Sequence, residues 1–307
     1  MPAVDRGKFG QPGSAPLMNW HEVPLVFDCE GSRLVGIVAQ PEHPLETGMV
    51  IVVGGPQYRA GSHRQFTLLA RQLAEQGIAS IRFDYRGMGD SEGDIRYFEA
   101  IDADIRAAVK HLIAQIPHLK QVSLWGLCDA ASAALYYAHT DPRVQGLILL
   151  NPWAHSQAAS ARAKIKYYYL NRLMSPAFWI KLFTGKVKVG SSISDFAGSA
   201  RQASATGAQH EVTPIIDLRY GSPGYIDRML QGLKQFGGKV ELILSGNDLT
   251  AQAFEELVRI DRKWQKACSD PRVSVKKLPH ATHTFSHRGW RDQVGKWSAS
   301  FLKSLRN

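Results

Sequence analysis

The residues best suited to chemistry lie in the stretch 121–137, QVSLWGLCDAASAALYY, where an apolar run stops at Gly126 and an Ala-rich helical pattern begins after Cys128. A strand, a tight turn and a helix in this order form a nucleophile elbow, whose usual pattern G-x-S-x-G lifts a serine above the sheet. Here Cys128 takes the nucleophile position and Ala130 replaces the second glycine. We interpret Cys128 as a candidate nucleophile. The structural alternative is a small buried thiol that packs in the turn.

The position of Cys128 at the start of a helix bears on its reactivity. A helix N-terminus carries partial positive charge, which favours a thiolate over a thiol. We therefore expect a pKa below that of an average cysteine. The carboxylate of the next residue, Asp129, opposes this ionisation unless it points into solvent or towards a cation such as Arg86.

Two further reacting groups follow predicted strands near the end of the chain. Asp248 comes after the predicted strand 240–244, and His283 comes after the predicted strand 273–277. In a catalytic triad, histidine takes the proton of the nucleophile, and a carboxylate holds the histidine in the right tautomer. The chain order nucleophile, acid, histidine also accompanies the elbow pattern. We assign the triad Cys128, His283 and Asp248.

Alternatives stay open for the acid and the base. Asp248 also suits the N-cap of the helix that follows it. His280 lies nearer the end of its strand than His283 and is a second candidate base, with His287 a third. Asn151 stands after another strand, at an alternative place for the acid, but an amide cannot do that work as well as a carboxylate.

An oxyanion hole needs backbone N–H groups beside the nucleophile. The first donor is expected from Asp129, and the second from the loop that follows the strand 49–53. That loop begins Gly-Gly-Pro at 54–56. Since proline has no N–H, Gln57 or Tyr58 is the expected donor. Taken alone, Gly-Gly-Pro is also an ordinary turn.

These residues are placed by a regular alternation of predicted strands and helices. A hairpin (25–28 and 34–39) comes first, and strands are then expected at 49–53, 78–83, 121–125, 144–150, 240–244 and 273–277, with helices at 62–76, 101–116, 129–137, 251–267 and 289–305. This alternation predicts an α/β fold with a doubly wound, mostly parallel sheet. Ligands of such sheets bind beyond the carboxyl ends of the strands, where each candidate residue lies.

Composition limits the classes of function. The 307 residues are 44% hydrophobic and 21% charged, which is typical of a globular protein. The net charge of +10 is widely spread, which does not favour nucleic acid as a partner. The three cysteines fit neither a disulfide framework nor a zinc site, and suit a reducing cytoplasm. The N-terminus lacks the apolar core of a signal peptide, no apolar stretch approaches a membrane span, and no cofactor is implied.

The alternation is interrupted between the two parts of the predicted core. We expect a flexible arm at 1–20, a core at 21–153 and 239–307, and a helical lid insertion at 154–238. Basic and aromatic residues, including Tyr168 and Trp179, interleave in the insertion and would cover an apolar substrate together with Trp153. A surface helix on anionic lipid headgroups would look similar, so a peripheral membrane contact is the alternative.

Together these residues resemble the α/β-hydrolase superfamily from about residue 23 to 305. The loop 83–93, FDYRGMGDSEG, is similar to the D-x-R-G-x-G-x-S-x-G loop of many of its esterases, lipases and acyl hydrolases. More narrowly, the segments 54–66, 125–132 and 151–153 resemble the exosortase A system-associated hydrolase 1 family. That resemblance implies a hydrolase encoded beside exopolysaccharide and protein-sorting genes, and leaves the substrate open.

The sequence therefore predicts a cytoplasmic enzyme that cleaves a small-molecule ester or thioester through an acyl-thioester on Cys128. The resemblance extends to superfamily members with a cysteine nucleophile, which include dienelactone hydrolases and the polyester synthases. Two other functions remain open. One is acyl transfer on the same fold, and the other is a non-catalytic interaction protein. The sequence does not predict the oligomeric state.

Overall fold

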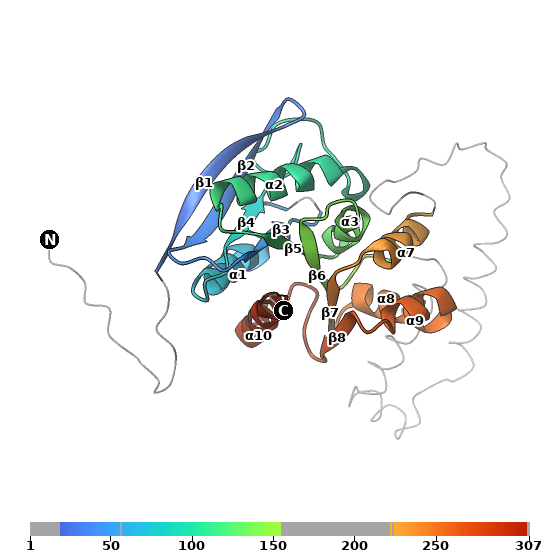
Figure 1. Ribbon diagram of the computed structural model, residues 1–307. Coiled ribbons are helices and arrows are strands. Elements are labelled where there is room, and N and C mark those ends of the chain that lie inside the picture. The colour runs from blue at the N-terminus through green and yellow to red at the C-terminus, as the bar shows by residue number, and fades with distance from the viewer. Residues whose placement is uncertain (1–18, 56, 155–221, 223, 306–307) are drawn as a thin grey trace, which may run out of the picture.

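The computed structural model describes residues 19–55, 57–154, 222 and 224–305 (Figure 1). Within these residues eight strands form one sheet in the order β1-β2-β4-β3-β5-β6-β7-β8. The strands are β1 (Trp20–Cys29), β2 (Ser32–Pro41), β3 (Thr47–Val52), β4 (Ser80–Phe83), β5 (Gln121–Leu127), β6 (Val144–Leu150), β7 (Lys239–Ser245) and β8 (Val273–Leu278).

The sheet is mostly parallel, as the alternation predicted. β1 pairs antiparallel with β2, and β2 antiparallel with β4, while every other neighbouring pair is parallel. The carboxyl ends of β3, β5, β6, β7 and β8 therefore meet at one edge of the sheet. β3 is buried along its whole length, which explains its unbroken apolar run.

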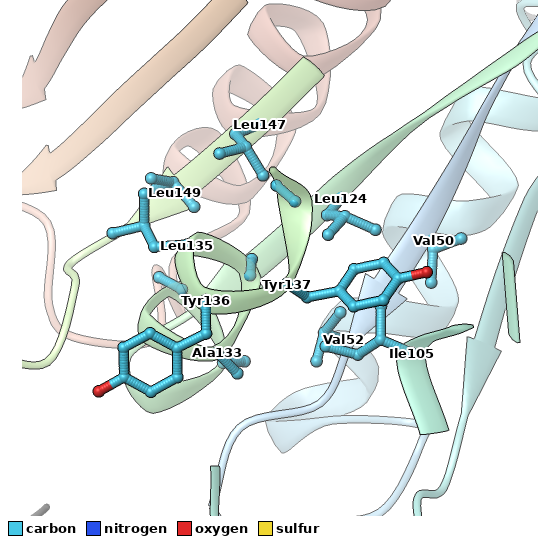
Figure 2. Close-up of a cluster of buried hydrophobic side chains, with 14 of the residues drawn as sticks. Val50, Val52, Ile105, Leu124, Ala133, Leu135, Tyr136, Tyr137, Leu147 and Leu149 are labelled. Atoms are coloured by element: carbon cyan, nitrogen blue, oxygen red, sulfur yellow. The ribbon is translucent and has the colours of Figure 1, made fainter. Parts of the chain in front are cut away.

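One face of the sheet is covered by α2 (Asp102–Gln115), α3 (Asp129–Ala138) and α7 (Tyr225–Gln235), and the helices α8 (Leu249–Ile260) and α9 (Arg262–Cys268) add to the same apolar cluster. Figure 2 shows part of this core, in which side chains of β3, β5, β6 and α2 gather around α3. Tyr137 of α3 is fully buried there. Its small neighbours Ala130, Ala133 and Ala134 let α3 lie close to the sheet.

The opposite face is covered by α1 (Gln65–Ala74) and α10 (Arg288–Ser304), which contact each other (Figure 1). Their apolar side chains pack on those of β3, β5 and β6 that point to this side. Two short 3₁₀ helices, η1 (Ser62–Arg64) and η2 (Phe98–Ala100), precede α1 and α2. None of the helices in the described part of the chain is long and apolar enough to cross a membrane.

The predicted fold class is confirmed, with one local correction to the predicted elements. The expected helix 251–267 is two helices, because Asp261 has extended backbone and its side chain accepts hydrogen bonds from the N–H groups of Lys263 and Trp264. The range 154–238, expected as an insertion, contains α7, which packs on α3 of the core. There the Tyr136 hydroxyl donates to Tyr225 O at 3.0 Å. Residues 155–221 and 223 of the expected lid, and residues 1–18 of the expected arm 1–20, lie outside the described residues, while Trp20 belongs to β1.

The glycine-dense loop that follows β4 is fixed by buried ion pairs. Asp84 is fully buried and accepts hydrogen bonds from both the side chain and the backbone N–H of Arg59. Arg86 pairs with the fully buried Asp104 of α2, with Nη2 and Oδ2 2.9 Å apart. These contacts tie the loop 84–93 to its neighbours. We call this segment the charged loop.

Candidate active site

The strand β5, the turn at Cys128 and the helix α3 form the expected elbow. Cys128 has φ 63° and ψ −124°, a backbone conformation that is strained for a residue with a side chain. Gly126 makes the turn possible, because a Cβ there would lie 2.6 Å from the carbonyl carbon of Ala130. Ala130 is itself fully buried. Both flanking positions therefore have to stay small.

The charge environment of Cys128 differs from the prediction. Burial raises the pKa of its thiol well above the ordinary value, and the carboxylates of Asp129 and Asp248 raise it further. The backbone N–H of Asp129 favours the thiolate but does not compensate. The expectation of a lowered pKa was wrong, because desolvation and two nearby negative charges outweigh the helix N-terminus. Cys128 is a thiol at neutral pH and needs a base to react.

His283 and Asp248 are brought together at the carboxyl ends of β7 and β8. The Nδ1 atom of His283 lies 3.0 Å from Oδ2 of Asp248. A carboxylate only accepts, so the ring donates from Nδ1, and Nε2 of the neutral ring is left to accept a proton. The Asp248 side chain is 8% exposed and that of His283 is 34% exposed. The pair is thus buried on its acid side and accessible on its base side.

Asp248 makes the contacts of both roles that the sequence left open. Its carboxylate accepts from Ala251 N at 3.0 Å and Thr250 N at 3.3 Å, which caps α8, while it also holds His283. The other candidate bases lie elsewhere. His280 is exposed, and His287 accepts from Gly289 N at 3.2 Å as the N-cap of α10.

The pair and the elbow lie within electrostatic reach of each other. Asp248 acts on the pKa of Cys128, and His283 lowers that of Asp129. Among the described residues no hydrogen bond joins the Cys128 thiol to His283. A direct proton-transfer contact is therefore not formed in this conformation.

Asn151, at the carboxyl end of β6, has a role that the sequence did not reveal. Its backbone has φ 43°, which asparagine tolerates better than most residues. Its Nδ2 donates to Ser245 Oγ at 2.8 Å and to the backbone oxygen of His283 at 3.1 Å, and its Oδ1 accepts from Ser245 N at 2.9 Å. Asn151 therefore ties the histidine loop to the sheet. Its position after β6 was the available signal, but only tertiary contacts identify its partners.

The loop after β3 approaches the elbow through Gly55, which the sequence analysis did not single out. The Gly55 N–H donates to Asp129 Oδ2 at 2.9 Å, and the Tyr85 hydroxyl donates to Gly55 O at 3.2 Å. The Gln57 N–H also donates to Gly55 O, at 2.8 Å. This bond argues against Gln57 as an oxyanion donor, because its N–H is used within the turn. The Tyr58 N–H has no partner among the described residues.

The Asp129 carboxylate, whose orientation the sequence left open, points at this loop and not at Arg86. Oδ2 accepts from Gly55 N, and Oδ1 accepts from Ala130 N at 2.9 Å. Burial raises the pKa of Asp129 to about 6, although the backbone hydrogen bonds and His283 favour the charged form. No basic side chain pairs with it among the described residues. Gly54 must be glycine, because a Cβ there would lie 2.5 Å from Asp129 Oδ1.

The remaining predicted site residues are only partly described. Trp153 lies close to the elbow. Its backbone N–H donates to Cys128 O at 3.1 Å, and its backbone carbonyl accepts from Ser132 Oγ at 2.9 Å. Tyr168 and Trp179 lie outside the described residues. No group of three or more metal-ligating side chains occurs in the described part of the chain.

Comparison with known proteins agrees with this architecture. The model of the Hydrolase_4 family, described as serine aminopeptidase S33, matches residues 47–235. The chain is 23% identical over 298 residues to the quorum-quenching protein AidA of Acinetobacter baumannii, covering 88% of this chain and 87% of that protein. It is 33% identical over 92 residues to the polyketide transferase grgF of a Penicillium species, covering 27% of this chain and 30% of that protein.

Among solved structures, the chain is similar to the esterase Pf2001 of Pyrococcus furiosus, with a TM-score of 0.60 and 15% identity over 94% of this chain and 93% of that one. At this identity the likeness establishes the fold. The family match spans the elbow, the loop after β3 and the charged loop. The chain therefore belongs to the serine aminopeptidase S33 family of α/β-hydrolases, and it has a cysteine at the elbow.

Proposed function

We propose that this α/β-hydrolase cleaves a carboxylic ester or thioester through a triad of Cys128, His283 and Asp248. The observation that carries the proposal is the 3.0 Å hydrogen bond between His283 Nδ1 and Asp248 Oδ2, at the same edge of the sheet as the Cys128 elbow. An imidazole held by a carboxylate, with its second nitrogen available, is the general base that a protonated thiol requires.

In the first half of the reaction, His283 Nε2 takes the Cys128 proton as sulfur attacks the substrate carbonyl. The carbonyl oxygen becomes an oxyanion, which we assign to the backbone N–H groups of Asp129 and Tyr58. When the intermediate collapses, the carbon–oxygen or carbon–sulfur bond to the leaving group breaks. His283 then gives its proton to the leaving alcohol or thiol, and an acyl-thioester remains on Cys128.

In the second half, water replaces the leaving group. His283 takes a proton from the water as its oxygen attacks the thioester carbonyl, and the carbon–sulfur bond breaks when the second intermediate collapses. The Cys128 sulfur regains the proton and the carboxylic acid is released. His283 thus serves as base and then acid in both halves, while Asp248 holds its ring throughout.

Several finer features belong to this proposal. The N-terminal arm would cover 1–18, and residues 155–221 would form a lid that excludes water and lines the acyl site through Tyr168 and Trp179, beside Trp153. The similarity of 54–66 and 125–132 to the exosortase A system-associated hydrolases favours a role in exopolysaccharide biology. Free thiols at Cys29, Cys128 and Cys268 are compatible with a cytoplasmic location.

Acyl transfer is the second candidate. It is favoured by the similarity to a polyketide transferase, whose name describes transfer, over 92 residues. The acyl-thioester would then react with an alcohol or amine in place of water. Hydrolysis predicts free acid as the only acyl product when an alcohol is added, whereas transfer predicts a new ester whose yield grows with the alcohol concentration.

The test of the triad is covalent labelling with a p-nitrophenyl ester followed by intact-protein mass spectrometry. The wild type should gain one acyl group on Cys128 with release of p-nitrophenol. Cys128→Ala should gain none, and His283→Ala should acylate at least about a hundredfold more slowly. His280→Ala is the matched control and should behave as wild type. Labelling spread over Cys29 and Cys268 without ester turnover would favour a non-catalytic interaction protein, and full turnover in Cys128→Ala would rule out Cys128 as the nucleophile.

A further inference from the structure

The carboxylate of Asp129 lies between the two segments that must face a reacting carbonyl. It accepts hydrogen bonds from Gly55 of the loop after β3 and from Ala130 in the first turn of α3, both at 2.9 Å. It therefore connects the loop that carries Tyr58 to the helix that follows the nucleophile. The hydrogen bond from Gly55 N to Asp129 Oδ2 joins the Gly54–Gly55 segment directly to the elbow.

Both the backbone N–H and the backbone carbonyl of Gly55 are hydrogen-bonded. Asp129 accepts from its N–H, and the Tyr85 hydroxyl donates to its carbonyl at 3.2 Å. Gly55 has φ 59°, a conformation open to glycine, and Gly54 leaves no room for a Cβ beside Asp129. Gly54 is therefore required by its contact with the Asp129 carboxylate, and Gly55 by the backbone conformation of the turn.

We propose that Asp129 is a positioning residue, whose ionised side chain fixes the oxyanion loop against the elbow through the Gly55 N–H. The inference rests on the proposed role of Cys128 as nucleophile. It assigns to the Asp129 side chain a function separate from that of its backbone N–H. Only the ionised carboxylate has two acceptor oxygens available, one for Gly55 and one for Ala130.

This arrangement carries a cost for the nucleophile. The Asp129 charge raises the pKa of the Cys128 thiol, so the same carboxylate that positions the loop suppresses the thiolate. Three titratable groups interact with the Asp129 carboxylate, namely Cys128, His283 and Tyr85, and Asp248 acts in turn on Cys128. The Asp129 carboxylate should therefore favour turnover by positioning the loop and disfavour thiolate formation by its charge. A group that merely stabilised the elbow would not have these two opposite effects. That opposition provides the test.

The test compares two reactions of the same sulfur in Asp129→Asn. Turnover of p-nitrophenyl butyrate needs the oxyanion loop, whereas alkylation of Cys128 by iodoacetamide needs only the thiolate. An amide offers one acceptor oxygen in place of two, so we expect kcat/KM to fall about tenfold or more. Alkylation should accelerate several-fold, because one opposing charge is removed. The wild-type kcat/KM should also contain a step near pH 6 that the variant lacks.

Tyr85→Phe is the matched control, because it releases the other side of Gly55 without removing a charge. Its kcat/KM should fall while its alkylation rate stays unchanged. The proposal is overturned if Asp129→Asn keeps wild-type kcat/KM, or if turnover and alkylation fall together, which would indicate a distorted elbow. If Cys128→Ala abolishes turnover while Asp129→Asn is unaffected, only the inference fails. Turnover retained in Cys128→Ala overturns the proposed function and the inference with it.

Discussion

Two neighbouring regions of the molecule use buried carboxylates in different ways. In the charged loop 84–93, Asp84 pairs with Arg59, and Arg86 pairs with Asp104. At the elbow, Asp129 is held by backbone N–H groups alone, and Asp248 is shared between a helix cap and His283. The first region satisfies its charges with opposite charges. The second leaves its charges unbalanced.

This difference shows in the pKa values. The hydrogen bonds to Asp104 raise the pKa of Arg86, which keeps it charged at any physiological pH. Burial instead raises the pKa of Asp129 to about 6 and that of the Cys128 thiol still further above its usual value. Of these two groups only Asp129 is kept near a change of protonation at neutral pH, and strongly perturbed pKa values of this kind are typical of functional sites. The charged loop therefore serves the fold, and the elbow is suited to chemistry.

The largest expected effect is the loss of activity in Asp248→Ala. Without the carboxylate, His283 loses the partner that fixes its tautomer, and kcat should fall by about 10³- to 10⁴-fold. Loss of the cap on α8 should also cost about 0.5–2 kcal/mol of stability. Ester turnover and urea unfolding measure the two effects separately.

Asp261→Ala provides the control for the cap. Asp261 accepts from Lys263 N at 2.7 Å and Trp264 N at 3.3 Å at the start of α9, and it holds no histidine. It should show a similar loss of stability with unchanged turnover. A comparable loss of kcat in both variants would mean that Asp248 acts only as a cap. Asp248 would then stabilise the fold, as the carboxylates of the charged loop do, and would have no separate part in the chemistry.

The second effect concerns the charged loop. Arg86→Ala leaves the fully buried Asp104 without its cation, which should cost about 3–5 kcal/mol of unfolding free energy. Arg33→Ala is the control, because its pair with Glu92 is exposed and should contribute nothing measurable. Equal losses in the two variants, measured by urea unfolding, would show that burial of the pair is not what stabilises the loop.

The smallest effect is a pH dependence of stability in Asp129→Asn. Because the pKa of Asp129 is raised in the folded protein, ionising it costs folding free energy. The cost is absent when the carboxyl is protonated in both the folded and unfolded states, and is fully present above about pH 6. Removing the charge should therefore favour the variant more at pH 8 than at pH 5, by about 1 kcal/mol.

Thermal melts of both proteins at the two pH values measure this shift. Tyr85→Phe is the control, since burial raises the pKa of Tyr85 far above its ordinary value and the residue does not ionise in this range. A difference between Asp129→Asn and wild type that stays the same at both pH values would contradict a perturbed carboxyl at the elbow.

The sequence by itself determined which elements form and which edge of the sheet carries the site. Apolar runs of strand length, each ending in glycine or polar residues, placed Cys128, Asp248 and His283 after β5, β7 and β8. The elbow was predictable because its constraints are local, since Gly126 and Ala130 must both be small to allow the turn. The split of α8 from α9 was missed because a single capping aspartate, Asp261, outweighed an unbroken helical pattern.

Only the tertiary structure decided how the charges at that edge balance. The helix N-terminus suggested a lowered pKa for Cys128, but burial and the carboxylates of Asp129 and Asp248 reverse the direction. Likewise Asn151 and Gly55 acquire their partners from segments far away in the chain. Secondary structure depends on neighbours along the chain, which the sequence displays. Desolvation and charge–charge energies depend on distances between distant segments, which exist only once the chain has folded.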